Sequence, residues 1–484
     1  MSVTAPVAGH ASVRRVPGTG ALVLSLPEGR GKAPALAGRS SAPTEWTLED
    51  CVKRRAHSRA ALATVVLVLL TACSTDEEPE TDAQGTEEAA GPEVTITPEP
   101  GATEVAPNTP VRVEAEGGTI TDVRIDQVDQ VDAAEAGDGE AEGAREPTVH
   151  DVTGTLNEDE DAWVADWNLH PGSAITVTAT ATDDEGEETE VVSEFTTQDT
   201  TEGQSLELAS NFPTSGQTVG VGMPVIINFD LPVTNKEQVE NSMEVISEEE
   251  TQGAWNWVSD QMAVFRPEEY WEPYQQIAVD LHLAGVEASD GVFGVSDHRI
   301  EFEVGREMIS TMHVPDHEME VSVDGEDVRT IPVSNGAADE RFNTTTSGVH
   351  LTMEKYESLV MDSATVGIEE GEPGHYRLDV DWAVRTSNSG EFSHAAPWNS
   401  GNLGSANTSN GCTNMSVDDA RWFHDESLMG DVLETTGTDR ELEWDNGWGF
   451  YQRSWEEWLE QSATGEPQST DGSGTPGGVH GEDL

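Results

Sequence analysis

The chain has 484 residues, which is enough for about three domains of ordinary size. It carries 93 acidic residues against 24 Lys and Arg, and its formal net charge is −69. A surface so negative repels phosphate backbones and anionic headgroups, which excludes nucleic acid as a partner and disfavours charge-driven binding to a membrane. Such acidity is typical of proteins adapted to high salt, and ordinary acidic solubility is the alternative.

Residues 52–73 have the pattern of an export signal. A basic stretch at 53–59 precedes the apolar run 60–70, and the sequence Leu-Thr-Ala-Cys ends at Cys73. An apolar run this short cannot span a bilayer as a mature helix. The pattern resembles bacterial lipoprotein signals, whose Cys becomes the acylated first residue. We therefore expect a lipid anchor at Cys73 on the outer face of the plasma membrane; an ordinary cleaved signal is the alternative.

Residues 1–51 precede this signal, although a signal normally begins at the N-terminus. Val52 heads the basic region and is consistent with a GTG start codon read as valine, which predicts that 1–51 are a mis-called extension. A long basic leader is the rival interpretation. With Cys51 in the extension and Cys73 acylated, the exported chain is left with one free thiol, Cys412, and no disulfide.

The exported chain begins with a tether and two β-rich units. Residues 74–93 are polar, acidic and without aromatic residues, which predicts a disordered tether. Short alternating apolar runs then predict antiparallel β-sandwiches of the immunoglobulin kind at 94–200 and 205–305, with an acidic insert at 132–146 in the first. The second unit is also expected to contain a short helix at 235–241.

An aromatic cluster occurs in the second β-rich unit. It comprises Trp255, Trp257, Tyr270, Trp271 and Tyr274. We expect these side chains to pack in the core and between domains, since large aromatic residues are mostly buried. A glycan-binding face is the alternative.

The rest of the chain predicts a third β-rich unit. Residues 318–336 have the pattern of a hairpin with Asp324-Gly325 at a type I′ turn, and 376–387 that of a further strand. Ser416 followed by Asp419 predicts the start of a helix whose N-terminus would favour a thiolate at Cys412 just before it. A helix at 453–462 is expected to dock on this unit through Trp455 and Trp458. A disordered tail is expected from about residue 464.

One stretch of this unit stands out chemically. Residues 392–417 form the longest run of the chain without Asp, Glu, Lys or Arg. Within it, His394 is followed by 17 mostly small or polar residues and then by Cys412. A thiol becomes a nucleophile when a nearby base takes its proton and no anion opposes the thiolate. The spacing alone leaves coincidence open.

The residues around this pair resemble the signature of the L,D-transpeptidases of bacterial cell walls, the YkuD-like catalytic domain. HAAPW, the spacing, and SNGCTNMS match that family's His segment and its S-H-G-C motif with an Asn two residues later. Other segments between about 205 and 437 are similar to actinobacterial multidomain members. One departure is central: the His of S-H-G-C is Asn410 in this chain.

The resemblance implies a mostly β fold, with two immunoglobulin-like β-sandwich domains followed by a β-rich L,D-transpeptidase catalytic domain at 306–437. A short C-terminal helical extension at 438–463 and a tail at 464–484 complete the expected organisation. It also implies an enzyme that forms 3→3 peptidoglycan cross-links through a thioester on Cys412. In that reaction His394 is the general base and then the acid, oriented by the backbone carbonyl of Ala395. The N–H groups of Gly411 and Cys412 stabilise the oxyanion.

By the same resemblance, a set of side chains lines or supports the substrate site: Asn410, Asn414, Trp398, Met361, Tyr376, Ser389 and Thr413. We expect Asn410 to brace the turn before Gly411 rather than to donate to the oxyanion. Val366 stands where some members have a lid tyrosine. The expected partners are donor and acceptor stem peptides, with carbapenems as covalent inhibitors. No cofactor is expected.

Two other functions remain open. One is an L,D-carboxypeptidase that uses water as the acceptor on the same site. The other is a catalytically impaired wall-binding lipoprotein, against which the intact His394, Gly411, Cys412 and Asn414 argue. No metal is expected at this site, because His394, Cys412 and His424 lack a conventional zinc spacing.

The acidity generates a prediction about salt. The melting temperature should rise through the molar KCl range, because residues 307–484 alone carry 35 acidic and 8 basic residues that repel one another. Screening shortens the reach of that repulsion to ~3 Å near 1 M salt. Thermal unfolding followed by circular dichroism checks this, with sucrose as a non-ionic control. A midpoint that is equal in low and molar KCl contradicts it.

Overall fold

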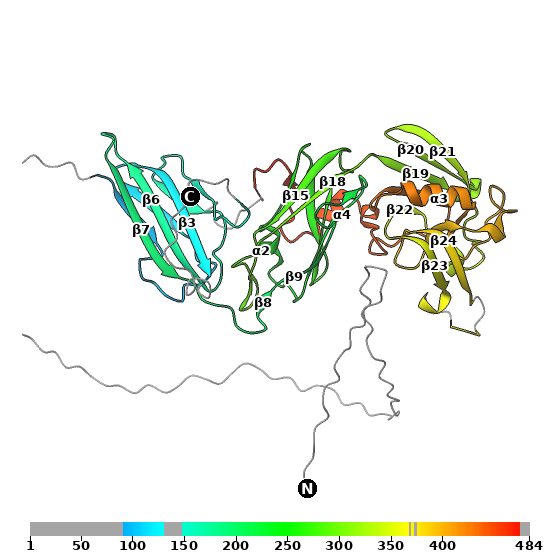
Figure 1. Ribbon diagram of the computed structural model, residues 1–484, viewed down its shortest axis with the longest axis horizontal. Coiled ribbons are helices and arrows are strands. Elements are labelled where there is room, and N and C mark those ends of the chain that lie inside the picture. Colours follow the sequence, from blue (N-terminus) through cyan, green and yellow to red (C-terminus); the bar gives the residue numbers. More distant parts are fainter. Residues whose placement is uncertain (1–90, 130–147, 367–368, 372–374, 475–484) are drawn as a thin grey trace, which may run out of the picture. The chain divides into compact units, whose positions relative to one another are not determined.

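The computed structural model describes residues 91–129, 148–366, 369–371 and 375–474 (Figure 1). The fold is mostly β, with immunoglobulin-like domains followed by a catalytic domain and few helices, as predicted. The expected extension, the signal with Cys73, most of the tether and the whole acidic insert lie outside the described residues.

The first sandwich packs a four-stranded sheet, in the order β1-β2-β5-β4, against the three-stranded sheet β3-β6-β7 (Figure 1). Strict alternation in β6 explains the packing, because every second side chain from Ser173 to Ala181 is buried. Val113, Ile175 and Phe195 belong to its core. The bounds are β1 Glu93–Thr97, β2 Arg112–Glu116, β3 Thr119–Asp129, β4 Gly154–Leu156, β5 Ala162–Ala165, β6 Ser173–Thr182 and β7 Glu188–Thr196.

The second sandwich consists of the sheets β10-β18-β15-β12 and β28-β13-β14-β11-β9, with a small sheet β16-β17-β8. The expected helix is present as α2, Lys236–Glu240. The bounds are β8 Ser205–Leu206, β9 Leu208–Phe212, β10 Thr218–Val219, β11 Val225–Phe229, β12 Met243–Ser247, β13 Gln252–Ser259, β14 Met262–Pro267, β15 Gln275–Leu281, β16 Glu287–Ser289, β17 Val292–Gly294, β18 His298–Val304 and β28 Gln468–Ser469.

Two expectations about this sandwich are decided by its packing. Trp255 and Trp271 are buried in the core, and Trp257 and Tyr270 pack against it, as predicted, whereas Tyr274 is exposed. The tail expected to be disordered from about 464 instead adds β28 to the edge of β13 and buries Gln468. Backbone pairing along a free sheet edge gives this polar segment an ordered place that its composition does not reveal.

The catalytic domain contains two sheets with α3 between them (Figure 1). One sheet has the order β21-β20-β19-β27-β22 and the other β23-β24-β25-β26. The bounds are β19 Met308–His313, β20 Glu318–Val323, β21 Glu326–Pro332, β22 Gly348–Leu351, β23 Lys355–Asp362, β24 Arg377–Arg385, β25 Phe392–Ala395, β26 Thr413–Met415, β27 Val432–Thr436 and α3 Val417–Glu426. The short 3-10 turns are η1 Val314–Asp316, η2 Arg341–Asn343, η3 Ser363–Val366, η4 Pro397–Asn399 and η5 Phe450–Gln452.

The turn and the helix cap that the sequence predicts in this domain are both present. Asp324 and Gly325 have φ values of 50° and 77°, which a type I′ turn requires at both central positions. Ser416 caps α3, because its hydroxyl accepts from the Asp419 N–H at 3.1 Å. The helix buries Ala420 and Phe423 in the core between the two sheets.

The C-terminal helix α4, Trp455–Leu459, docks on the second sandwich rather than on the catalytic domain. Its Trp458 is fully buried, and the indole N–H donates to the Ala254 carbonyl at 2.9 Å. The buried Arg266 guanidinium lies 4.9 Å from the Trp458 ring. The amphipathic pattern identifies the apolar face of this helix, but not which of two apolar surfaces receives it.

Candidate active site

The pairing of two short strands brings the predicted nucleophile and base together. Strands β25 and β26 are parallel neighbours, with His394 opposite Asn414 and Ser393 opposite Thr413. Cys412 is the residue directly before β26, so the register places it beside the strand that carries His394. The 17-residue loop therefore folds back as the sequence analysis required.

A cavity of about 150 Å³ opens at this point. Seven of the predicted residues line it: Cys412, His394, Asn410, Asn414, Trp398, Met361 and Tyr376. The other lining residues were not predicted from the sequence; they are Leu378, Val380, Asn399, Thr408 and Ser409. The alternating pattern of β24 could have indicated Leu378 and Val380, since both lie on one face of that strand.

Two predicted residues point elsewhere. The Thr413 hydroxyl is buried and donates to Asn335 Oδ1 at 2.9 Å. Ser389 is exposed, and its backbone N–H donates to the side chain of Asn446 at 2.8 Å. Neither residue lines the cavity. Each can support the substrate site only by holding the loops around it.

His394 is held in a form suited to accept a proton. Its Nδ1 lies 2.9 Å from the Ala395 carbonyl, which is the contact expected for that residue. Because a carbonyl can only accept, Nδ1 carries the hydrogen and Nε2 keeps its lone pair. The ring is buried, and burial lowers the pKa of His394 below its usual value, so the imidazole is neutral at neutral pH.

Cys412 is a protonated thiol at rest. Burial raises the pKa of the Cys412 thiol to about 12. Its Sγ lies 3.7 Å from the Gly390 carbonyl oxygen, and no hydrogen bond within the described chain joins it to His394. The thiol and the imidazole line the same cavity.

A carboxylate that the sequence analysis missed lies beside the thiol. Glu391 is one residue outside the uncharged run and is buried close to the turn that carries Cys412. Burial opposes its charge, but hydrogen bonding with His350 and Thr346 holds the pKa of Glu391 below its usual value. Its negative charge adds to burial in raising the thiol pKa. The expectation that no anion opposes the thiolate is therefore wrong.

Glu391 is fixed by a small network behind the cavity. The Thr346 N–H and hydroxyl donate to its two oxygens at 3.0 and 2.5 Å. The His350 ring lies 2.8 Å from the same hydroxyl, and Arg440 approaches the carboxylate to 3.7 Å. The neighbouring Thr345 donates to the Gly411 carbonyl at 2.7 Å. This arrangement anchors the turn before the nucleophile, which no local sequence signal indicated.

The turn before Cys412 is braced by Ser409 rather than by Asn410. Ser409 Oγ accepts from the Gly411 N–H at 3.1 Å and donates to the Cys412 carbonyl at 2.6 Å. Asn410 is exposed at the cavity wall, and its amide makes no hydrogen bond within the described chain. Gly411 has a φ of 117°, a backbone conformation that residues other than glycine rarely adopt. Since Ser409 occupies the Gly411 N–H, the Cys412 N–H is the backbone donor left for an oxyanion.

The helix after the nucleophile begins at its cap Ser416, as expected, but it does not directly follow Cys412. Strand β26 separates Cys412 from α3, whose first residue is Val417. Because the effect of a helix dipole is limited to about the first turn, α3 stabilises a thiolate at Cys412 only weakly. His424, the residue considered with His394 and Cys412 for zinc, instead packs on Trp382 and contacts Asp425 at 3.1 Å.

Sequence comparison places the chain in a known class. Residues 308–434 match the model of the L,D-transpeptidase catalytic domain, and residues 102–287 match that of the bacterial Ig domain. The chain is 34% identical to L,D-transpeptidase 1 of Mycobacterium tuberculosis (strain H37Rv) over 213 residues, which cover 44% of this chain and 78% of that protein. It therefore belongs to the L,D-transpeptidase family.

Longer relatives are similar over part of their length. L,D-transpeptidase 2 of M. tuberculosis (strain CDC 1551 / Oshkosh) is 33% identical over 48% of this chain, and L,D-transpeptidase 5 (strain H37Rv) is 32% identical over 50%. The chain spans 57% and 53% of these two proteins. A solved structure of an L,D-transpeptidase in complex with imipenem is 34% identical, with a TM-score of 0.42, covering 47% of this chain and 98% of that chain.

The Ser409 brace generates a prediction about acylation. Ser409→Ala should slow acylation of Cys412 by ~10²-fold, because it frees the turn that positions the oxyanion donor. Asn410→Ala should cost about tenfold or less, roughly the loss of one exposed hydrogen-bonding group. His394→Ala should cost on the order of 10²–10⁴-fold.

Single-turnover acylation at one pH measures all three losses. Ser405→Ala is the matched control, because this exposed serine of the same loop donates only to the Asn402 carbonyl. If Asn410→Ala lowers the acylation rate as much as Ser409→Ala or more, Ser409 is not the residue that braces the turn.

Proposed function

We propose that the chain is a cysteine-dependent L,D-transpeptidase that forms 3→3 cross-links between peptidoglycan stems through a thioester on Cys412. The observation that carries this proposal is the neutral His394, oriented through Nδ1 by the Ala395 carbonyl, in one cavity with the thiol. Family membership supports the same reaction class.

In the first half-reaction, Cys412 turns away from the Gly390 carbonyl and gives its proton to His394 Nε2. The sulfur then attacks the carbonyl of the third residue of a tetrapeptide stem. The resulting oxyanion accepts from the Cys412 N–H. The bond to the terminal D-Ala breaks as His394 returns the proton to the departing amine, which leaves a thioester on Cys412.

In the second half-reaction, the side-chain amine of a second stem's diamino acid attacks the thioester. His394 takes a proton from the amine and returns it to the sulfur as the carbon–sulfur bond breaks. The products are the cross-linked dimer and the original thiol. Because Cys412 is protonated at rest, transfer of its proton to His394 and attack are coupled, and a free thiolate is not maintained between turnovers.

The cavity offers the donor stem an apolar wall and a polar rim. Met361 and Val380 are buried next to Cys412 in one small apolar cluster. Trp398 is 53% exposed at the opening, and Asn410 and Asn414 supply amide groups. We assign the buried side chains to the donor peptide and the exposed indole to the path of the incoming acceptor.

A covalent test addresses the nucleophile. A carbapenem should add its full mass to the chain, because its strained β-lactam carbonyl acylates the thiol and the ring opens without a leaving group. Cys412→Ala should abolish the adduct, and Cys412→Ser should also abolish it while keeping the melting temperature of the native chain. Intact-protein mass spectrometry measures the result. An adduct that survives Cys412→Ala would rule out this nucleophile.

The choice of acceptor is tested with tetrapeptide stems. The transpeptidase should release D-Ala and yield a dimer two stems long, whereas an L,D-carboxypeptidase would yield tripeptides alone. Mass spectrometry of the products distinguishes the two. Carbapenem acylation without any turnover of stems would favour the impaired wall-binding lipoprotein.

We further propose that the protein is exported and lipid-anchored through Cys73, as its signal pattern indicates. Among the helices of the described residues, none has both the length and the apolar character needed to cross a bilayer. Expression in a Gram-positive host should place the protein in the membrane fraction, with lipid on the N-terminal Cys73 of the mature chain. Cys73→Ala should abolish that lipid modification, and a lipid-free product from the native gene would exclude the anchor.

A further inference from the structure

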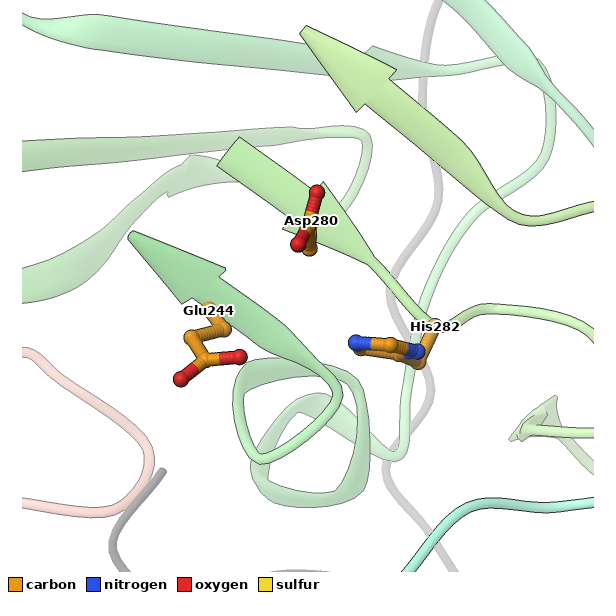
Figure 2. A group of neighbouring side chains, drawn as sticks. All are labelled: Glu244, Asp280 and His282. Carbon is orange, nitrogen blue, oxygen red and sulfur yellow. The ribbon is translucent and has the colours of Figure 1, made fainter. Parts of the chain in front are cut away.

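Three ionisable side chains converge in the second sandwich, away from the active-site cavity. Glu244 lies on β12 and Asp280 directly opposite it on β15, and His282 follows β15. Their ligand-type oxygen and nitrogen atoms all lie within 4.8 Å of one another. Figure 2 shows the three side chains facing a common point, with an imidazole nitrogen turned toward the two carboxylates.

These groups do not satisfy one another. No hydrogen bond within the described chain joins any two of them, although each is more than nine-tenths buried. Like charges placed directly opposite on neighbouring strands are destabilising unless something compensates them. The imidazole nitrogen aimed at the carboxylates makes no hydrogen bond to either of them.

Contacts with neighbouring residues outside the cluster hold the three side chains in place. Arg299 Nη1 donates to both Asp280 oxygens at 3.0 and 2.7 Å, and the Gly474 N–H donates to Glu244 at 3.0 Å. The Trp167 ring stacks on His282 with centroids 3.6 Å apart and an angle of 4°. Partners of this kind orient metal ligands in proteins, where the second oxygen or ring nitrogen is hydrogen-bonded to an outer group.

The local charge also favours a cation. Arg299 pairs with Asp280 and also with Glu301, and its side chain is 44% exposed, so the charge of the two carboxylates is not fully balanced by a buried partner. A neutral imidazole offers a ring nitrogen lone pair for coordination. A cavity of about 470 Å³ reaches the cluster and provides room for water ligands.

We propose that Glu244, Asp280 and His282 bind one divalent transition-metal ion of the zinc class. One nitrogen and two carboxylate oxygens are ligands that Zn²⁺ accepts at ~2.0–2.2 Å, and the imidazole disfavours Mg²⁺ and Ca²⁺. Small rotamer shifts of the two carboxylates would bring their oxygens to that distance from a single ion. The ion would tie β12 to β15 and, through Trp167 and Gly474, would fasten the first sandwich and the tail to the second.

Zinc binding to the full chain tests the site. After treatment with EDTA, equilibrium dialysis against Zn²⁺ in excess Mg²⁺ and molar KCl should show one tightly bound ion that Cys412→Ala retains. Glu244→Gln keeps the side-chain shape, and His282→Phe keeps a ring against Trp167. Each should weaken binding roughly tenfold or more. Zinc should also raise the melting temperature of the native chain but not of Glu244→Gln.

Glu237→Gln is the matched control, because it removes the same charge from an exposed position of the same domain. It should leave zinc affinity unchanged. Absence of a tight site would overturn the proposal, as would a site lost in Cys412→Ala or one indifferent to both Glu244→Gln and His282→Phe. If His282→Phe does not fold, the zinc affinity of Glu244→Gln and the effect of zinc on its melting temperature decide the outcome.

Discussion

The catalytic domain depends on the parallel pairing of β25 with β26, because that register places Cys412 beside His394. Parallel neighbours need a long crossover, and here an uncharged loop provides it. Amide side chains fasten the loop: Asn399 donates to Ser334 at 3.0 Å, and Asn407 donates to the Val314 carbonyl at 3.0 Å. Neutral amides make these buried bonds without the desolvation cost of a charge, which explains why the run lacks acidic and basic residues.

Electrostatics at the nucleophile involve two opposed requirements. The turn at Gly411 is anchored through Thr345 and the neighbouring Glu391 network, which needs a buried carboxylate. That carboxylate disfavours a thiolate at Cys412. The structure therefore favours a resting thiol that is deprotonated only when a substrate is present, with His394 as the base among the described residues that line the cavity. A resting thiol is also less open to oxidation than a thiolate.

The catalytic domain is joined closely to the second sandwich. The N–H groups of Gly220 and Gly222 donate to the carbonyls of Met429 and Gly430 at 2.8 and 3.0 Å, and a side chain at Gly220 would collide with Asp431. The chain then returns to the sandwich through α4 and β28. A proposed metal ion at Glu244 would stiffen the same sandwich, so the second sandwich would hold the catalytic domain at a fixed orientation.

The sequence by itself determined the strands, the type I′ turn at Asp324, the helix cap at Ser416 and the pairing of His394 with Cys412, because each rests on local chemistry or on a motif. Tertiary structure alone decided the roles of Ser409 and Glu391, the docking of α4, the pairing of β28 with β13 and the convergence of Glu244 with His282. Those features depend on which distant surfaces meet: a serine, a buried acid or an amphipathic helix has the same local pattern whichever partner it finds.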